Sequence, residues 1–530
     1  MPSETQAGLE KAWASTCRVL FSRETCPLEK CSGWLGSYLE HYPASSSIIS
    51  GSEVSFPHGE YQQGCRAVAL GEVDFAKKFE PLSINEMKDI DSIAAALGER
   101  ACFAGNVLLG NSRFVEKSTN VLDSHFVLSS SSITSSKYVA HSQYVKGSEY
   151  IFGILGMERS THAVKCMGSD YRRCFECHMG EVLSDCYYCA KSQNCQDCMF
   201  CFGAENSSYM VGNTKLAPDK YASLKKKLLS EISETLSKDG RVFSLFEVIS
   251  GSSSHAIDSR ITPIKEKATH FDISPIEKVF SNTCSLLFKR DMGKMSDYAS
   301  YLKRHVPQNL PLKSAISKSR VLVSSYRVHL LRKNDISKRM ATDDELRLIG
   351  KVGLGEKEIA KLEGDLESAV SVLHPIAYMN LDKVVGKIRN MKDCTVVIDA
   401  TDCIDCSAPI RCKRCAHSFW PSSSEAIFGS SISWDSSFCI KCFHSKKITR
   451  ALECDSCENC SDLYFSHNCE NARDSMFCFN KKNLSFAIGN AELPQAEYSR
   501  IKASLVSQLA DELERKKTLK WDIFSLAGKS

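Results

Sequence analysis

Apolar residues recur every twelve positions in two long stretches of the chain. The apolar column consists of Val127, Val139, Ile151, Ala163, Phe175, Tyr187 and Met199 in the first stretch, and of Ile404, Ala416, Phe428, Ile440, Leu452, Tyr464 and Met476 in the second. Two positions further on, a second column is mostly small. A twelve-residue period with inward apolar and small positions is typical of a parallel β-solenoid, whose short strands stack at about 4.8 Å. A β-sandwich is the alternative, but it gives no reason for such a long column.

The two stretches also resemble each other in sequence. Residues 194–213 (NCQDCMFCFGAENSSYMVGN) align without gaps with residues 471–490 (NARDSMFCFNKKNLSFAIGN), and ten of the twenty positions are identical. This agreement predicts a tandem duplication. We expect the halves to pack about a pseudo-two-fold axis, or the chain to form a homo-oligomer.

Amphipathic helices are predicted on both sides of each solenoid. Runs that begin at Pro218 and Pro494 place apolar residues on one helical face, with proline near the first turn. Residues 84–100 and 342–374 are compatible with helices that precede the solenoids. The predicted fold class is therefore α+β, with two tandem parallel β-solenoids of twelve-residue, right-handed coils. Each solenoid is preceded by helical segments and followed by a helix that flanks or caps it.

These patterns divide the chain into six segments. They are an N-terminal, mainly helical segment (1–99), the first solenoid (100–216), its flanking helix (217–250), a linker with a second helical segment (251–395), the second, Cys-rich solenoid (396–493) and a C-terminal flanking helix (494–530).

Composition and charge narrow the class of protein. The 530 residues are 43% hydrophobic and 25% charged, as expected for a folded chain that buries a core. A net charge of +4 makes a nucleic-acid binder an unfavoured interpretation. No apolar run is long enough to span a membrane, and the N-terminal residues lack the pattern of a secretion signal. We therefore expect a cytoplasmic protein with no membrane contact.

The 26 cysteines are the outlying feature of the composition. Two C-x-x-C pairs, Cys412/Cys415 and Cys439/Cys442, are separated by 23 residues, which is a zinc-ribbon-like spacing. They are the primary candidates for a metal site, with zinc or an iron–sulfur cluster as the cofactor. The further candidates are Cys403, Cys406, Cys454, Cys457 and Cys460.

Packing is the competing interpretation of these cysteines, and it predicts no cofactor. Many of them fall in the repeating columns, and a buried free cysteine behaves as a small hydrophobe that suits a narrow interior. In extended chain, the two sulfurs of a C-x-x-C pair would also point to different faces. Disulfides between stacked coils are a third interpretation.

The repeated closing segment carries a resemblance to a group of proteins. Residues Met199 to Asn213 with Tyr221, and Met476 to Asn490 with Tyr498, resemble uncharacterised microbial Cys-rich β-solenoid proteins. The resemblance covers roughly residues 100–240 and 395–515. It implies the solenoid fold, here duplicated, and no established activity.

Three functions follow from these patterns. The first is a non-enzymatic scaffold that presents its faces to protein partners. The second is a zinc or iron–sulfur protein that uses the cysteine pairs of the second half. An enzyme is the least favoured, because no nucleotide-binding loop, metalloprotease motif or nucleophile elbow is present in the sequence.

Overall fold

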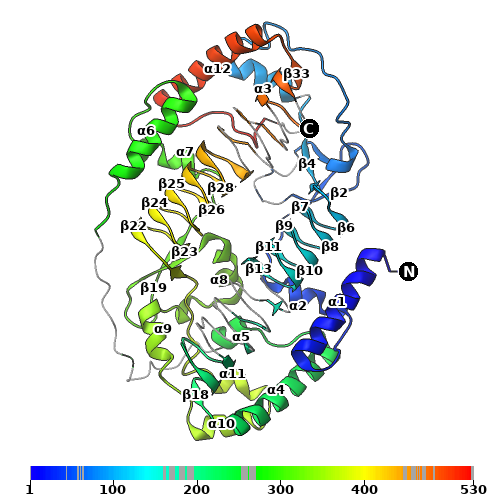
Figure 1. Ribbon diagram of the computed structural model, residues 1–530, viewed down its shortest axis with the longest axis vertical. Helices are drawn as coiled ribbons and strands as arrows, with labels where there is room; N and C mark the ends of the chain where they lie inside the picture. Colours follow the sequence, from blue (N-terminus) through cyan, green and yellow to red (C-terminus); the bar gives the residue numbers. More distant parts are fainter. Residues whose placement is uncertain are drawn as a thin grey trace.

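The structure is a computed structural model of the whole chain, with helices and parallel strands, so the predicted α+β class is confirmed (Figure 1). It describes residues 2–526 apart from positions 43, 57–58, 60, 62–64, 99, 159–162, 166–173, 178–185, 188–195, 252–260, 262–269, 446–450, 455–460, 462–463, 465, 468–472 and 482–483. Most strands belong to two groups, which we call the first stack (residues 103–215) and the second stack (residues 384–492).

The first stack contains two parallel five-stranded sheets, ordered β14-β12-β10-β8-β6 and β13-β11-β9-β7-β5. Each strand pairs with the strand two further along, and paired residues are twelve positions apart, as in Val127 with Val139, except between β5 and β7, where they are thirteen apart. The bounds are β4 (Phe103–Gly105), β5 (Leu108–Leu109), β6 (Arg113–Glu116), β7 (Thr119–Leu122), β8 (His125–Leu128), β9 (Ser131–Thr134), β10 (Lys137–Ala140), β11 (Gln143–Lys146), β12 (Glu149–Phe152), β13 (Leu155–Glu158), β14 (Ala163–Val164), β15 (Cys186–Tyr187), β16 (Gln196–Met199), β17 (Ser208–Val211) and β18 (Thr214–Lys215).

The second stack also contains parallel sheets with twelve-residue pairing, ordered β22-β24-β25-β27-β29 and β26-β28-β30, and here β24 pairs directly with β25. Its bounds are β21 (Val384–Val385), β22 (Arg389–Lys392), β23 (Val397–Ile398), β24 (Thr401–Ile404), β25 (Lys413–Ala416), β26 (Phe419–Ser422), β27 (Glu425–Phe428), β28 (Ser431–Trp434), β29 (Ser437–Ile440), β30 (Phe443–Ser445), β31 (Arg473–Met476), β32 (Ser485–Ile488) and β33 (Ala491–Glu492).

Serines stabilise the turns between strands of the first stack. The Ser124 hydroxyl donates to its neighbour Leu122 O at 2.8 Å and accepts the amide of Ser136, twelve residues later, at 3.0 Å. The same arrangement joins Ser130 to Ser142. Because each hydroxyl satisfies one buried backbone group of the next repeat, serine suits this position better than an apolar residue would.

Each stack has an inner core between its sheets and an outer core beneath the helices. The first inner core contains Val127, Val139 and Ile151, and the second contains Cys403, Cys415 and Ile427. The outer cores contain the next residue along each strand, such as Phe152 in the first stack and Phe428 in the second.

The predicted apolar column does not occupy one structural position. In the second stack it contributes to the outer core, so the prediction that it faces inward is wrong there. In the first stack it starts in the inner core at Val127 and ends in the outer core at Phe175, Tyr187 and Met199. The cause is a step of eleven residues between Val164 and Phe175, which shifts the register of the repeat by one.

Helices cover the outer cores. The helices predicted after Pro218 and Pro494 are confirmed as α4 (Pro218–Asp239) and α12 (Gln495–Lys516). Helices α1 (Glu4–Phe21) and α2 (Leu28–Leu35) pack on the first stack, where Trp13 meets Phe152 edge to face. Helices α6 (Ser274–Phe288) and α7 (Ala299–Lys303) pack on the second, where Phe280 meets Phe428.

The segment that precedes each stack lies at the far end of the other stack. The segment containing β1 (Ser45–Ser46), β2 (Glu53–Val54), β3 (Ala67–Ala69) and α3 (Ile90–Gly98) reaches the second stack, where Asn480 Nδ2 donates to Cys102 O at 2.7 Å. The segment containing α9 (Asp343–Ile349) and α10 (Glu356–Leu362) reaches the first stack, where Leu354 N donates to Gly212 O at 3.1 Å. The remaining elements are α5 (Leu245–Ser250), α8 (Val328–Asn334), α11 (Ser368–Val372), β19 (Leu310–Lys313) and β20 (Arg320–Val323).

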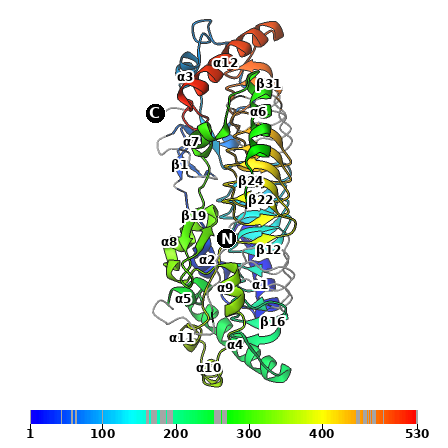
Figure 2. The same ribbon diagram turned by 90° about the vertical axis from the view of Figure 1, so that its left-hand side faces the viewer.

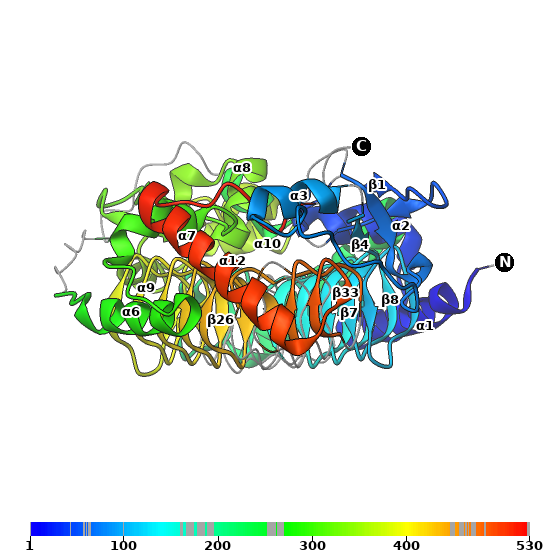
Figure 3. The same ribbon diagram turned by 90° about the horizontal axis from the view of Figure 1, so that it is seen from above.

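The two stacks lie side by side and run in opposite directions (Figure 1). They touch where Tyr144 of the first stack meets Phe419 and Trp420 of the second. Most helices and loops lie to one side of the layer of strands (Figures 2 and 3). Within the described part of the chain, no helix combines the length and the apolar character needed to cross a membrane.

Candidate metal centre

Three buried sulfur atoms meet in the second inner core. Cys403 lies in β24, Cys415 lies in β25, and Cys412 immediately precedes β25. None of the three side chains is exposed, and their sulfurs all lie within 4.8 Å of one another. Cys403 Sγ and Cys412 Sγ are 3.8 Å apart. Thiolates bound to one zinc ion at about 2.3 Å in tetrahedral geometry are separated by nearly that distance. The trio can therefore hold a metal ion.

The backbone explains why both sulfurs of the Cys412/Cys415 pair face inward. Cys403 and Cys415 are register partners in neighbouring parallel strands, so their side chains stack on the same face. Arg414, between the paired cysteines, has φ +53°, in the left-handed region. This residue interrupts the alternation of a regular strand. The expectation that the sulfurs of a pair point to different faces is therefore wrong for this pair.

The three thiols interact strongly with one another. Hydrogen bonds from Cys412 and Cys415 hold the pKa of Cys403 well below its ordinary value. The same contact with Cys403 raises the pKa of Cys412, and burial above all raises the pKa of Cys415. Loss of one proton from the trio is therefore favoured, because the remaining thiols can donate hydrogen bonds to the thiolate that forms.

The other predicted ligands lie elsewhere in the second inner core. Cys439 is a register partner of Ile427, which stands between it and Cys415. Two such steps of about 4.8 Å place the Cys439/Cys442 pair on the far side of Ile427 from the trio. The structure thus joins Cys412 and Cys415 with Cys403.

The secondary candidates are divided between the inner core and the undescribed part. Cys406 and Cys454 are buried in the second inner core. Cys457 and Cys460 lie outside the described residues. His417, which follows Cys415 by two residues, contacts Asp405 Oδ2 at 3.1 Å, and Asp405 also pairs with Lys303. The described ligand set of the trio therefore consists of sulfur alone.

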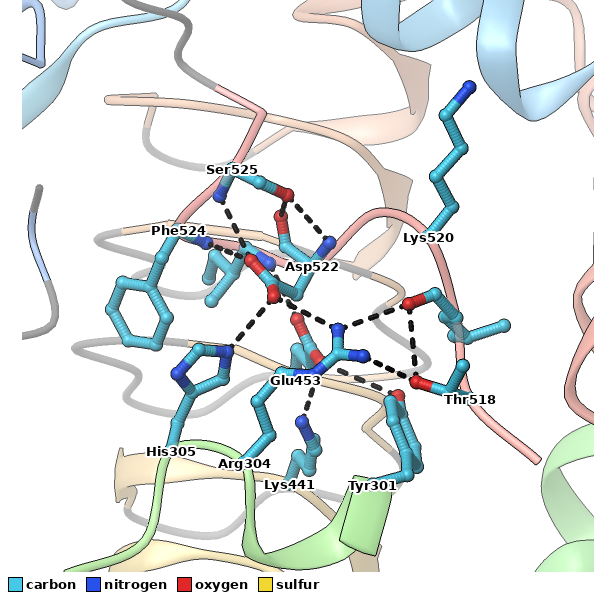
Figure 4. Close-up of polar contacts among 12 residues, drawn as sticks. Tyr301, Arg304, His305, Lys441, Glu453, Thr518, Lys520, Asp522, Phe524 and Ser525 are labelled. Carbon is cyan, nitrogen blue, oxygen red and sulfur yellow. Dashed lines mark hydrogen bonds and ion pairs between the residues drawn. The ribbon is translucent and has the colours of Figure 1, made fainter. Parts of the chain in front are cut away.

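A second polar cluster is buried in the second half, and sequence analysis missed it (Figure 4). Lys441 Nζ lies 3.2 Å from Glu453 Oε1, and neither side chain is exposed. The Tyr301 hydroxyl donates to Glu453, and Lys441 sits over the Tyr301 ring at 4.2 Å from its centre. Burial lowers the pKa of Lys441 and raises that of Glu453, while each charge opposes the shift of the other.

The C-terminal segment closes over this pair. Ile523 N donates to Glu453 Oε2 at 2.5 Å. The next carboxylate, Asp522, lies 2.9 Å from His305 Nε2 and 3.3 Å from Arg304 Nη1 (Figure 4). The cluster therefore anchors the chain that follows α12 to the second stack.

The first half contains a matching cluster. Lys165 and Glu176 are buried, the Tyr38 hydroxyl donates to Glu176, and Leu245 N donates to the same carboxylate at 2.5 Å. Lys165 lies over the rings of Trp34 and Tyr38. Burial lowers the pKa of Lys165 to about 8. The only sequence signal for these clusters is that a lysine and a glutamate lie about one repeat apart in each stack. The same spacing would also be found on a strand whose charged side chains face solvent.

No protein-family model, curated protein or solved structure matches this chain.

Proposed function

We propose that each stack is a right-handed parallel β-solenoid of twelve-residue coils, and that the two halves arose by tandem duplication. The twelve-residue pairing and the separate inner cores support the solenoid. Matched details support the duplication. Asn213 Nδ2 donates to Phe202 O and Asn490 Nδ2 donates to Phe479 O, at 2.9 and 2.7 Å.

The halves then form an internal pseudo-dimer. Each half reaches across to the end of the other's stack, as the contacts of Cys102 with Asn480 and of Gly212 with Leu354 illustrate. Exchanged segments of this kind are a feature of intertwined homodimers. Of the two alternatives predicted from the sequence, this proposal therefore favours pseudo-two-fold packing of the halves within one chain over a homo-oligomer.

We propose that this scaffold binds a soft metal ion through Cys403, Cys412 and Cys415. The single observation that carries the proposal is the meeting of three buried sulfurs within 4.8 Å. Thiolates are the preferred ligands of soft metals such as zinc, monovalent copper and iron in iron–sulfur clusters. When bound, the ion would link two neighbouring strands and the turn between them, and would replace the protons that the thiols lose.

Metal content of the purified protein tests this function. The full chain is prepared without oxygen, and its metals are counted by mass spectrometry before and after a chelator. We expect about one tightly held soft metal per chain. The triple variant Cys403→Val/Cys412→Ser/Cys415→Val should bind none. A matched control, Cys198→Val/Cys201→Ser, changes two cysteines of the first inner core and should keep the metal. A wild-type protein that takes up no zinc, copper or iron contradicts the proposal.

Protein partners, a cytoplasmic location and the absence of enzymatic activity stay predictions from the sequence. A scaffold role with a separate partner is compatible with the metal centre, because the trio is internal and leaves the outer surfaces free for contacts.

A further inference from the structure

The two stacks differ in chemistry over the equivalent coils at the start of their inner cores, although later coils of the first also contain Cys174, Cys177, Cys198 and Cys201. Strands β6, β8, β10 and β12 of the first stack match β22, β24, β25 and β27 of the second, strand by strand, at a constant offset of 276 residues. The pairing registers agree as well, since Val115 pairs with Val127 in one stack and Met391 pairs with Cys403 in the other. Equivalent inner positions can therefore be compared directly.

Six equivalent positions carry sulfur in the second stack and none in the first. The second stack has Met391, Cys394, Cys403, Cys406, Cys412 and Cys415 where the first has Val115, Ser118, Val127, Ser130, Ser136 and Val139. The serines and cysteines even make the same contact, because Ser130 Oγ donates to Leu128 O and Cys406 Sγ donates to Ile404 O. Packing at these six positions is thus satisfied without sulfur in the first stack, so the run of sulfur at this end of the second stack favours a ligand role.

The sulfur row leads from the end of the stack to the trio. β22 is the edge strand of its sheet, and Met391 within it and Cys394 just after it are half-buried. Both pack against the second inner core. Cys406 and the trio behind them are completely buried. Cys394 and Cys406 belong to the same second inner core, Cys394 at its margin and Cys406 within it. The row therefore offers soft ligands from the partly open end inward.

We infer that this sulfur row is a binding site for monovalent copper, Cu(I), with Cys403, Cys412 and Cys415 as ligands and Met391 and Cys394 as the entry residues. The inference rests on the proposed metal-binding function and names its ion.

The ligand set distinguishes Cu(I) from the other soft metals. Structural zinc prefers four protein ligands in a tetrahedron, whereas Cu(I) is a soft ion for which sulfur ligands alone are well suited. The trio supplies three sulfurs, and His417, the nearest imidazole in sequence, is engaged with Asp405. An iron–sulfur cluster needs four cysteine ligands, and the fully buried trio supplies three.

Cu(I) binding to this row exchanges protons for the metal ion and changes no oxidation state. Binding needs no oxidant or reductant, because copper enters and stays as Cu(I). Each thiol that becomes a thiolate releases one proton to solvent. Two thiolates and one neutral thiol around Cu(I) leave a net charge of −1 in the inner core, and the third thiol keeps its proton.

Competition between metals tests the inference on the full-length protein. Apo-protein is titrated without oxygen with Cu(I) delivered from a chromophoric chelator, and separately with zinc, and each bound metal is counted. We expect about one Cu(I) per chain, retained against a tenfold excess of zinc. Stoichiometric zinc that excess Cu(I) does not displace overturns the inference but leaves the proposed function standing. Failure to bind either metal, or iron, overturns both.

The entry residues give a second, independent test. The variant Met391→Val/Cys394→Ser introduces the residues of the first stack, so its packing is one that this fold already accepts. We expect Cu(I) loading to slow roughly tenfold while the final stoichiometry is unchanged. The matched control Val115→Met/Ser118→Cys places the entry residues in front of Val127 and Val139 and should gain no copper. Loading of the entry variant at the wild-type rate contradicts the role of Met391 and Cys394.

Discussion

Lys441 and Glu453 form an ion pair that no solvent reaches, with Nζ 3.2 Å from Oε1. Removing both charges from water is costly, and the pair repays that cost only while both partners are present. The Tyr301 ring and hydroxyl and the amide of Ile523 complete its surroundings. The pair therefore ties the stability of the second stack to the C-terminal segment.

Loss of one partner should be far more damaging than loss of both. We expect Glu453→Leu to lower the free energy of unfolding by about 3–5 kcal/mol, because Lys441 is left buried without its counter-charge. The double variant Lys441→Met/Glu453→Leu should recover most of that loss. Chemical denaturation of the single and double variants measures the difference. A double variant no more stable than Glu453→Leu would show that the charges do not act as a pair.

The matching cluster of the first half provides the control for this experiment. Glu176→Leu and Lys165→Met/Glu176→Leu should repeat the pattern, since Lys165 and Glu176 are buried to the same degree. Opposite behaviour in the two halves would mean that the contact between Asp522 and His305 dominates the second cluster.

Asp522 should make the second half sensitive to acid. Burial alone raises the pKa of Asp522, but the hydrogen bond and charge of His305, with Lys441, outweigh it and hold the pKa well below its ordinary value. Since a depressed pKa favours the folded state only while the carboxylate is ionised, the stabilisation is present above about pH 4 and is lost as the pH falls.

Melting temperatures of the wild type and of Asp522→Asn, measured between pH 7 and pH 3, test whether the stabilisation by Asp522 is lost as the pH falls. We expect the variant to be less stable at pH 7 and the gap to narrow below about pH 4. His305, Arg304, Lys441 and Glu453 are the charged and titratable groups around Asp522, and the substitution leaves all four in place. A gap that widens in acid would contradict the prediction.

Helices and repeats were accessible from sequence because their signals are local. Pro218 at the start of an apolar stripe predicts α4, and the twelve-residue period predicts strands that pair at that spacing. The direction of the side chains could not be predicted from the sequence, because it depends on residues inside the strands whose backbone is in the left-handed region, such as Arg414 and Phe126. These break the two-residue alternation on which the interpretation of the C-x-x-C pairs depended.

The candidate site could be predicted only in part, because the sequence does not reveal which cysteine side chains point to the same place. Cys412 and Cys415 were identified by spacing, but their partner is Cys403, one coil away, and not Cys439 or Cys442. Only the register shows which cysteines share a layer, and Ile427 separates the two groups. The buried lysines left no distinguishable signal, since Lys165 and Lys441 follow strands at positions where a solvated lysine is equally common.

Metal binding should stabilise the fold measurably. A ligand that binds the folded state at a hundred times its dissociation constant adds about 2.7 kcal/mol. We expect Cu(I) to raise the melting temperature of the apo-protein and to leave that of Cys403→Val/Cys412→Ser/Cys415→Val unchanged. Differential scanning calorimetry without oxygen measures both. Equal shifts in the two proteins would place the copper on other cysteines.

The substitution Gly203→Ala tests whether a segment of the second half is held at the end of the first stack. Its φ is +70°, and a Cβ added there would lie 1.9 Å from the carbonyl oxygen of Leu346 in α9. Gly293 is the matched control, because its φ is +80° and a Cβ there meets nothing within 4 Å. Alanine at either position is destabilised by about 1–2 kcal/mol, because a non-glycine residue is strained in the left-handed conformation. Only Gly203→Ala also forces α9 away from the first stack.

Hydrogen exchange distinguishes the two variants. Gly203→Ala should speed exchange in residues 343–354 of the second half and lower the melting temperature well beyond the effect of Gly293→Ala. The reason is that Leu354 N and the Ile349 carbonyl bond to the end of the first stack at Gly212 and Asn213. Faster exchange confined to the first half would contradict the exchanged arrangement, because the disturbance would then have stayed within the half that carries the substitution.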